Sequence, residues 1–327
     1  MHLLIPFACS HAPGCELVLP SLQLPHLERL LQRLDAVGSD MGAASSLSPP
    51  HERVLAGTLG LGATDGCIAW AAHEARQAGH RVEGSAWAWV TPVHWDVGAD
   101  QITMADPHTL DLHEDDSRAL LAAMQPYFAG DGITLDYAAP TRWLARSPLF
   151  DKLPSASLDR VAGRDIGPWM PPVSDLRRLQ NEMQMLLYTN PVNDERVARG
   201  LATVNSFWVS GTGSLPAAYE PRSLPAAYES RSLPAAADSG SGGVVVATTL
   251  RAAAIRNDWT DWAQRWGDLD RQQCKALLQT LDAGEASQLT LCGERSALRF
   301  DLAPAGLLAR WRRRFTRTTL QDLQHQL

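Results

Sequence analysis

Short apolar runs alternate along this chain with segments whose apolar residues recur at helical spacing. Such an alternation restricts the fold more than any other feature, because strands separated by helices pack as layers of an α/β protein. Buried strands are predicted at 2–8, 204–211, 243–250 and 288–293. Amphipathic helices are predicted at 24–34, 115–128 and 175–187, and a further helix begins at Pro49-Pro50.

The middle of the chain, from 84 to 107, is rich in aromatic and β-branched residues and predicts two strands. We expect breaks at Thr91-Pro92 and at Gly98, since proline and glycine interrupt strands. Residues 133–145 predict one strand that continues past Pro140. The chain of 327 residues is long enough for one large domain or two medium ones.

Charge and composition limit the partners of the chain. The formal net charge of -7 argues against a generic nucleic-acid binder, whose phosphate contacts need a clustered basic surface. The basic cluster RWRRRFTR at 310–317 has two interpretations. It contacts nucleic acid or an acidic partner, or it is the solvated end of a helix. In an acidic chain the solvated helix end is the favoured interpretation.

The cysteines indicate the compartment. Five cysteines are scattered along the chain without a CxxC pair, which predicts reduced thiols and neither a disulfide framework nor a zinc site. The first residues, MHLLIPFACSHAP, lack the basic start and the apolar length of a signal peptide. No apolar run is long enough to span a bilayer. We therefore expect a cytoplasmic protein that does not enter a membrane.

A nonapeptide repeats between residues 214 and 242. SLPAAYEPR is followed by SLPAAYESR and then by SLPAAADSG, so the third copy lacks the tyrosine. Repeats that build structure bury a face of each copy against the next, with periods of 20 residues or more in most cases. We interpret residues 214–242 as a disordered surface loop that the fold tolerates, with a polyproline-type ligand as the alternative.

Three further patterns have both a functional and a structural interpretation. The doublets His73-Glu74 and His94-Trp95-Asp96 are candidate metal ligands, although isolated doublets are more often surface or packing residues. Trp259, Trp262 and Trp266 share one helix face. That stripe predicts core packing or the surface for a protein partner.

The segment TNPVNDERVARGLATVNSFWVSGTG at 189–213 resembles the archaeal-type cofactor-independent phosphoglycerate mutases of the alkaline phosphatase superfamily. Other segments follow in the order of that family, among them LPHLERLL, SLSPPHERVLAGTLGL and SLDRVAGRDIGPWMP. The chain also resembles, more closely, a conserved proteobacterial family described as RpfE-type regulatory proteins.

The resemblance implies a mostly parallel, alkaline-phosphatase-like sheet with helices on both faces. Residues 1–84 and 243–327 would form this α/β core, and residues 85–213 would form a smaller inserted α+β domain.

Phosphomutases of the superfamily hold two divalent metals with Asp and His side chains, and the metals activate a serine. By resemblance, Ala8-Cys9-Ser10 replaces the first metal-binding Asp, and Gly293 and Glu294 replace the last Asp-His pair. His51 stands at the nucleophile with Glu52 beside it, and no histidine lies between His113 and His325. We therefore expect no metal site of the family type and no cofactor.

The resemblance also implies residues that bind a phosphorylated acid with forked donors. They are Arg142, Arg160, Arg164, Asn193 and Arg196. Ordinary surface pairs with neighbouring Asp and Glu are the structural alternative.

Two functions follow. The first is a degenerate mutase, or pseudoenzyme, that regulates or binds a phosphorylated metabolite. The second is an active phosphoglycerate mutase, or another phosphoryl-transfer enzyme with a remodelled site, in which His51 accepts the phosphoryl group beside Glu52.

Overall fold

The structure is a computed structural model that describes residues 1–62, 64–216, 219, 243–302 and 318–327. The chain divides into two compact units. The first comprises Met1–Ser45, Pro49–Leu55 and Arg222–Leu327, and the second comprises Ser46–Ser48 and Ala56–Pro221. Residues 56–84 are thus grouped with 85–213. Whether the units correspond to a superfamily core and an inserted domain stays a prediction.

The first unit is built on a five-stranded mixed sheet with the order β2-β11-β10-β1-β9. Its strands are β1 (His2–Ile5), β2 (Asp35–Asp40), β9 (Val244–Val246), β10 (Gln288–Cys292) and β11 (Ala297–Asp301). β1 pairs in parallel with β9 and β10, while β11 is antiparallel to both β10 and β2. The predicted α/β fold with a sheet drawn from both ends of the chain is confirmed, but the sheet is mixed.

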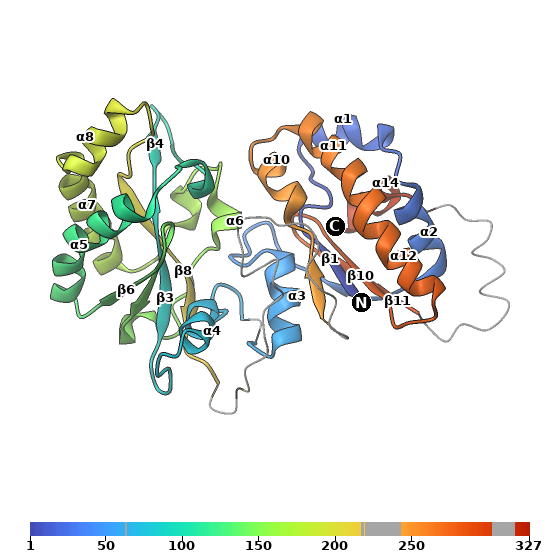
Figure 1. The fold of residues 1–327 in the computed structure, drawn as a ribbon, viewed down its shortest axis with the longest axis horizontal. Coiled ribbons are helices and arrows are strands. Elements are labelled where there is room, and N and C mark those ends of the chain that lie inside the picture. Colours follow the sequence, from blue (N-terminus) through green and yellow to red (C-terminus); the bar gives the residue numbers. More distant parts are fainter. Residues whose placement is uncertain (63, 217–218, 220–242, 303–317) are drawn as a thin grey trace. The chain divides into compact units, whose positions relative to one another are not determined.

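Helices cover one face of this sheet (Figure 1). The principal ones are α2 (Pro25–Arg33), α11 (Trp259–Leu269) and α12 (Lys275–Asp282). Their leucines and tryptophans form one core with alternate strand residues such as Leu3, Ile5 and Leu289. Shorter helical segments complete the unit: α1 (Pro13–Val18), η1 (Leu19–Ser21), η5 (Thr248–Leu250), α10 (Arg251–Ile255), the π-helical turn η6 (Asp270–Cys274), α14 (Leu320–Leu323) and η7 (Gln324–Gln326).

The second unit contains a four-stranded antiparallel sheet with the order β6-β7-β3-β8. Its strands are β3 (Trp87–Val93), β6 (Thr134–Ala139), β7 (Arg142–Arg146) and β8 (Ser206–Gly213). Helices α5 (Glu114–Gly130) and α7 (Ser174–Tyr188) bury their apolar residues against it. Helix α4 (Trp70–Gln77) contacts β3 and β8, and α8 (Pro191–Ala198) follows α7.

The remaining elements of this unit are short. They are the hairpin of β4 (Trp95–Val97) and β5 (Ile102–Met104), together with η2 (Pro107–Thr109), η3 (Pro148–Phe150), α6 (Leu158–Val161) and η4 (Gly167–Trp169). Helix α3 (Pro50–Leu59) begins at the predicted prolines, and the chain passes from the first unit to the second within it.

Two strand predictions need correction. β3 does not break at Thr91-Pro92 but continues to Val93, because its pairing with β7 ends at Val90 while its pairing with β8 continues. A proline without an N–H is tolerated where one side of a strand lacks a partner. Residues 133–145 form a hairpin in place of one strand, since the chain reverses between β6 and β7.

Most of the repeat, together with the basic cluster at 310–317, lies outside the described residues. Tyr219 of the first copy is described, and it is buried. No helix in the described part of the chain is long and apolar enough to cross a bilayer.

Candidate functional site at the carboxyl ends of the parallel strands

The loop after β1 is held by tryptophans from helix α11. Phe7 adopts a φ of 56°, a left-handed conformation that is unfavourable for a bulky residue. The indole Nε1 of Trp262 donates to the Phe7 carbonyl at 3.0 Å, and that of Trp266 donates to the Ala8 carbonyl at 3.1 Å. The Ala8 N–H donates to the Cys292 carbonyl at 2.8 Å. Of the two interpretations of the tryptophan stripe, core packing is the one that the structure shows. The stripe also fixes the loop where open α/β sheets bind ligands.

The donor groups at this end of the sheet are mainly buried thiols. Cys9, Cys15 and Cys292 are buried. Burial raises the pKa of the Cys15 thiol to about 11. Burial likewise raises the pKa of Cys9 and of Cys292 far above the ordinary value of a thiol. Protonated thiols are poor metal ligands and poor nucleophiles.

The loop after β10 is closed by the last residues of the chain. The backbone N–H groups of Arg295 and Ser296 donate to the Leu327 carbonyl oxygen at 3.2 and 2.9 Å. A Cβ on Gly293 would lie 2.5 Å from that same oxygen, so this position requires glycine. Gln324 Nε2 donates to the Ser10 carbonyl at 3.1 Å and ties the same segment to the β1 loop.

His51 and Glu52 lie in the first turn of α3, and both side chains are buried. The imidazole of His51 packs against Phe7 with 5.4 Å between ring centroids. Arg53 fixes the start of the helix, because its Nε lies 3.1 Å from both carboxylate oxygens of Asp40. These contacts bring His51 to the loop after β1, within the first unit.

The residues at the ends of β1 and β10 do not fit the two-metal centre that the resemblance implies. Divalent metals in phosphoryl-transfer sites are held by ionised carboxylates and imidazoles. At the corresponding positions stand a buried neutral thiol, a glycine enclosed by Leu327, and Glu294. These residues therefore do not support a metal-dependent reaction step at this position.

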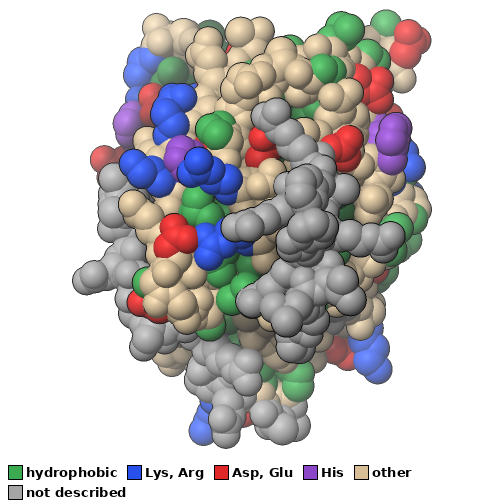
Figure 2. All heavy atoms as spheres, turned by 90° about the vertical axis from the view of Figure 1, so that its right-hand side faces the viewer, with side chains coloured by type: hydrophobic (Ala, Val, Ile, Leu, Met, Phe, Trp, Pro, Cys, Tyr) green, Lys and Arg blue, Asp and Glu red, His purple; other side chains and the backbone are tan. Residues whose placement is uncertain are grey.

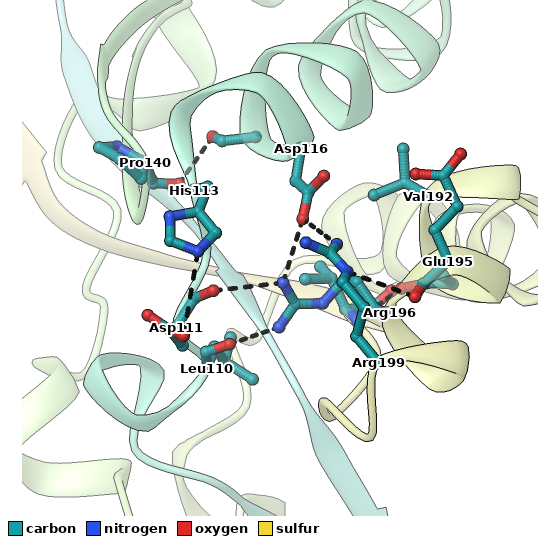
Figure 3. A network of polar contacts seen from close by, with 12 residues as sticks. Leu110, Asp111, His113, Asp116, Pro140, Val192, Glu195, Arg196 and Arg199 are labelled. Atoms are coloured by element: carbon teal, nitrogen blue, oxygen red, sulfur yellow. Dashed lines mark hydrogen bonds and ion pairs between the residues drawn. The ribbon is translucent and has the colours of Figure 1, made fainter.

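Arg196 on α8, one of the predicted ligand-binding residues, makes its bonds within the protein (Figure 3). Arg196 has no exposed surface. Its Nε donates to the Ala202 carbonyl at 2.9 Å, Nη2 donates to the Leu110 carbonyl, and Nη1 lies 3.4 Å from an Asp116 carboxylate oxygen. Burial lowers the pKa of Arg196. The arginine thus ties α8 to the start of α5.

Asn193 is occupied in the same way. Its Nδ2 donates at 2.8 Å to the carbonyls of Leu187 and Val204, and its Oδ1 accepts from the Val204 N–H at 2.8 Å. These bonds place Asn193 and Arg196 as structural residues that join α7, α8 and the approach to β8.

Arg142, Arg160 and Arg164 lie elsewhere in the second unit. Arg142 begins β7, donates to Glu74 Oε2 at 2.8 Å and lies 5.3 Å from the centroid of the Trp89 ring. Arg160 lies on α6 and is buried, whereas Arg164 follows α6 and is exposed. The structure therefore places the three arginines at β7, on α6 and after α6.

The doublet His73-Glu74 is divided between two contacts. Glu74 Oε2 accepts from Trp89 Nε1 at 2.7 Å as well as from Arg142. His73 Nδ1 lies 2.6 Å from the hydroxyl oxygen of Tyr219. The sequence identified the doublet but not its three partners, of which Arg142 and Tyr219 lie far away in the chain.

Charges of both signs are interspersed on the coloured part of the face in Figure 2. On α11 and the turn that follows it, Arg271 pairs with Asp268 at 2.6 Å and Arg265 pairs with Asp261 at 2.8 Å. Arginines paired in this way present little net positive charge to a phosphate backbone.

No family model matches this chain, and no curated protein matches it. Two solved structures resemble it in fold. A cofactor-independent phosphoglycerate mutase from Thermoplasma acidophilum is 15% identical with a TM-score of 0.34, covering 100% of this chain and 98% of that one. The PH0037 protein from Pyrococcus horikoshii is 11% identical with a TM-score of 0.43, covering 95% and 92%. At such scores the likenesses carry no argument about activity.

Proposed function

We propose that this protein is a degenerate relative of the cofactor-independent phosphoglycerate mutases that binds a phosphorylated acid and acts as a regulatory protein. The observation that supports this proposal most directly is the chemistry at the carboxyl ends of β1 and β10. Buried, protonated thiols and an enclosed glycine stand where a metal-dependent mutase needs ionised ligands. The resemblance to the RpfE-type regulatory proteins belongs to the same proposal.

The proposed ligand contacts are Arg142, Arg160 and Arg164. Guanidinium groups suit phosphate oxyanions, because they offer parallel donors and stay charged. The side chain of Arg142 is held in place by Glu74 and Trp89, so it would meet a ligand without much loss of side-chain entropy. Asn193 and Arg196 would act indirectly, by fixing α8.

A cytoplasmic location is part of the proposal. All five cysteines are free thiols in the structure, and four of them are buried. Free thiols are typical of proteins in a reducing compartment.

The alternative is an active phosphoryl-transfer enzyme with a remodelled site. One observation favours it: His51 and Glu52 are neighbouring ionisable residues, and both are less than 10% exposed, at 4% and 8%. Buried ionisable groups are uncommon and cluster at functional sites.

A thermal-shift experiment with metal analysis separates the two. A ligand that binds only the native state raises the melting temperature. We expect 3-phosphoglycerate to raise it without added metal, and Arg142→Gln and Arg164→Gln to abolish the shift. Arg199→Gln is the matched control, since Arg199 is an exposed arginine on the surface of the same unit.

Two findings would contradict the proposal. One is stoichiometric Mn²⁺ or Zn²⁺ at two ions per chain together with a ligand shift that requires the metal. The other is mutase activity that His51→Gln removes, because this would establish the alternative.

A further inference from the structure

Helix α4 holds the tyrosine of the first repeat copy in an enclosed position. Tyr219 is 7% exposed, although it belongs to a polar segment. Its hydroxyl oxygen lies 2.6 Å from His73 Nδ1, and the two rings meet edge to face with 5.7 Å between centroids. His73 has no exposed surface. A buried hydroxyl–imidazole hydrogen bond with ring packing is a specific way to recognise a tyrosine.

The contacts extend from the ring to the backbone of the motif. Arg76, one turn along α4 from His73, places its guanidinium 6.0 Å from the Tyr219 ring centroid and donates to the Tyr219 carbonyl at 3.3 Å. The Tyr219 N–H donates to the Pro216 carbonyl at 2.9 Å. The site on α4, formed by His73 and Arg76, therefore contacts the hydroxyl, the ring and the backbone carbonyl of the tyrosine.

The same motif is present a second time in the chain. Residues 214–219 and 223–228 both spell SLPAAY, whereas residues 232–237 spell SLPAAA. The hydroxyl, ring and backbone carbonyl that contact the α4 site in the first copy recur in the second, with Tyr228 in the place of Tyr219. The third copy has Ala237 there and lacks the ring and the hydroxyl.

We propose that the α4 site is a receptor for the SLPAAY motif, and that Tyr228 exchanges with Tyr219 as its occupant. Exchange moves nine residues of chain from one side of the anchor to the other. The cost of closing a loop grows slowly with its length, so the copies differ in occupancy by roughly two- to fivefold in favour of Tyr219. The docked tyrosine thereby divides the connection between β8 and β9 at either of two points, nine residues apart. This inference is independent of the proposed ligand and of catalysis.

Fluorine NMR of the full chain labelled with 3-fluorotyrosine tests the exchange. The chain has five tyrosines, and Tyr127, Tyr137 and Tyr188 serve as internal controls of folding. In the unsubstituted chain we expect Tyr228 to occupy the site in a minority of molecules, and in Tyr219→Ala we expect its resonance to shift fully to the docked position of Tyr219. In Tyr228→Ala we expect the Tyr219 resonance to stay docked.

Variants of the site identify where Tyr228 docks. We expect Arg76→Gln combined with Tyr219→Ala to lower the docked fraction of Tyr228 severalfold, and His73→Leu combined with Tyr219→Ala to abolish docking. Because His73 is buried, loss of docking in its variant is informative only if the three control resonances are unchanged. Arg76→Gln provides a second, independent test of where Tyr228 docks.

The proposal is overturned if the Tyr228 resonance in Tyr219→Ala is the same as in the unsubstituted chain while the control resonances stay native. It is also overturned if Tyr228 docks equally well in the Arg76 and His73 variants, or if its docking depends on protein concentration, which would indicate binding between two copies of the chain.

Discussion

Two arginines at the end of α8 contact the same carboxylate from different environments. Arg196 lies 3.4 Å from Asp116 and is fully buried, while Arg199 lies 2.6 Å from it with 42% of its side chain exposed. Removing one partner of a buried charged network leaves its other members unsatisfied, whereas an exposed pair is already solvated.

Arg196→Ala should therefore destabilise the protein far more than Arg199→Ala. We expect a loss of about 3–5 kcal/mol in the free energy of unfolding for Arg196→Ala, and less than about 1 kcal/mol for Arg199→Ala. Urea unfolding followed by circular dichroism measures both. Similar losses for the two variants would show that Arg196 is not the clamp between α8 and α5.

Glycines offer a second matched pair. A Cβ at Gly293 would lie 2.5 Å from the backbone oxygen of Leu327, whereas a Cβ at Gly57, within α3, would meet nothing within 4 Å. We expect Gly293→Ala to destabilise by about 1–3 kcal/mol through steric overlap, and Gly57→Ala to stabilise by up to about 1 kcal/mol through helix propensity. Thermal unfolding gives the sign of each change. An unchanged melting temperature for Gly293→Ala would mean that Leu327 does not close this loop.

At the scale of elements, α2 depends on a cap that lies far away in the sequence. Its N-cap residue, Leu24, offers no side-chain acceptor. Asp270, in the π-helical turn η6, accepts from the Leu27 N–H at 2.7 Å and from the His26 N–H at 3.3 Å. The carboxylate is 1% exposed and also contacts His26 Nδ1 at 2.9 Å. The first turn of α2 is thus completed by the element that packs against it.

We expect Asp270→Ala to destabilise the protein by about 1–3 kcal/mol, because it leaves buried donors of α2 without an acceptor. Asp268→Ala is the control, since Asp268 pairs with Arg271 at the surface. Hydrogen exchange should show faster exchange at Leu27 and neighbouring amides in the first variant only. Unchanged exchange there would contradict the capping role.

At the scale of the whole molecule, the histidines predict how stability depends on pH. Burial, followed by the nearby Arg299 guanidinium and the N-terminal amine, lowers the pKa of His2 to about 4, against the opposing effect of Asp301. His2 Nε2 also lies 2.8 Å from Thr290 Oγ1. Burial lowers the pKa of His73 in the same direction.

Between pH 4 and 6.5 the unfolded chain binds a proton at His2 that the folded chain does not bind. Stability should therefore rise with pH across this window, by about 1–3 kcal/mol for His2, and level off above it. His2→Gln should flatten the slope, as measured by urea unfolding at a series of pH values. A slope that is unchanged in His2→Gln would show that this histidine is not the titrating group.

The sequence alone indicated the parts of the fold that rest on local pattern. β1, α2, α5, α7 and β10 were predicted close to their observed bounds, because their apolar residues recur with the period of one element and meet one core. The tryptophan face of α11 was predicted for the same reason. The sequence also marked the segment of α8 and the doublet His73-Glu74 as unusual.

Only the tertiary structure decided what depends on partners far away in the chain. β2 is a polar edge strand with the sequence DAVGSD. No local sequence pattern predicts that it pairs with β11. The clamp that Arg196 forms with Asp116 and the contact of Tyr219 with His73 join residues that are 80 and 146 positions apart in the chain. The sequence gives the chemical groups of each side chain. The burial and the partners of a side chain arise only when distant elements pack together, and burial and partners determine what its chemical groups do.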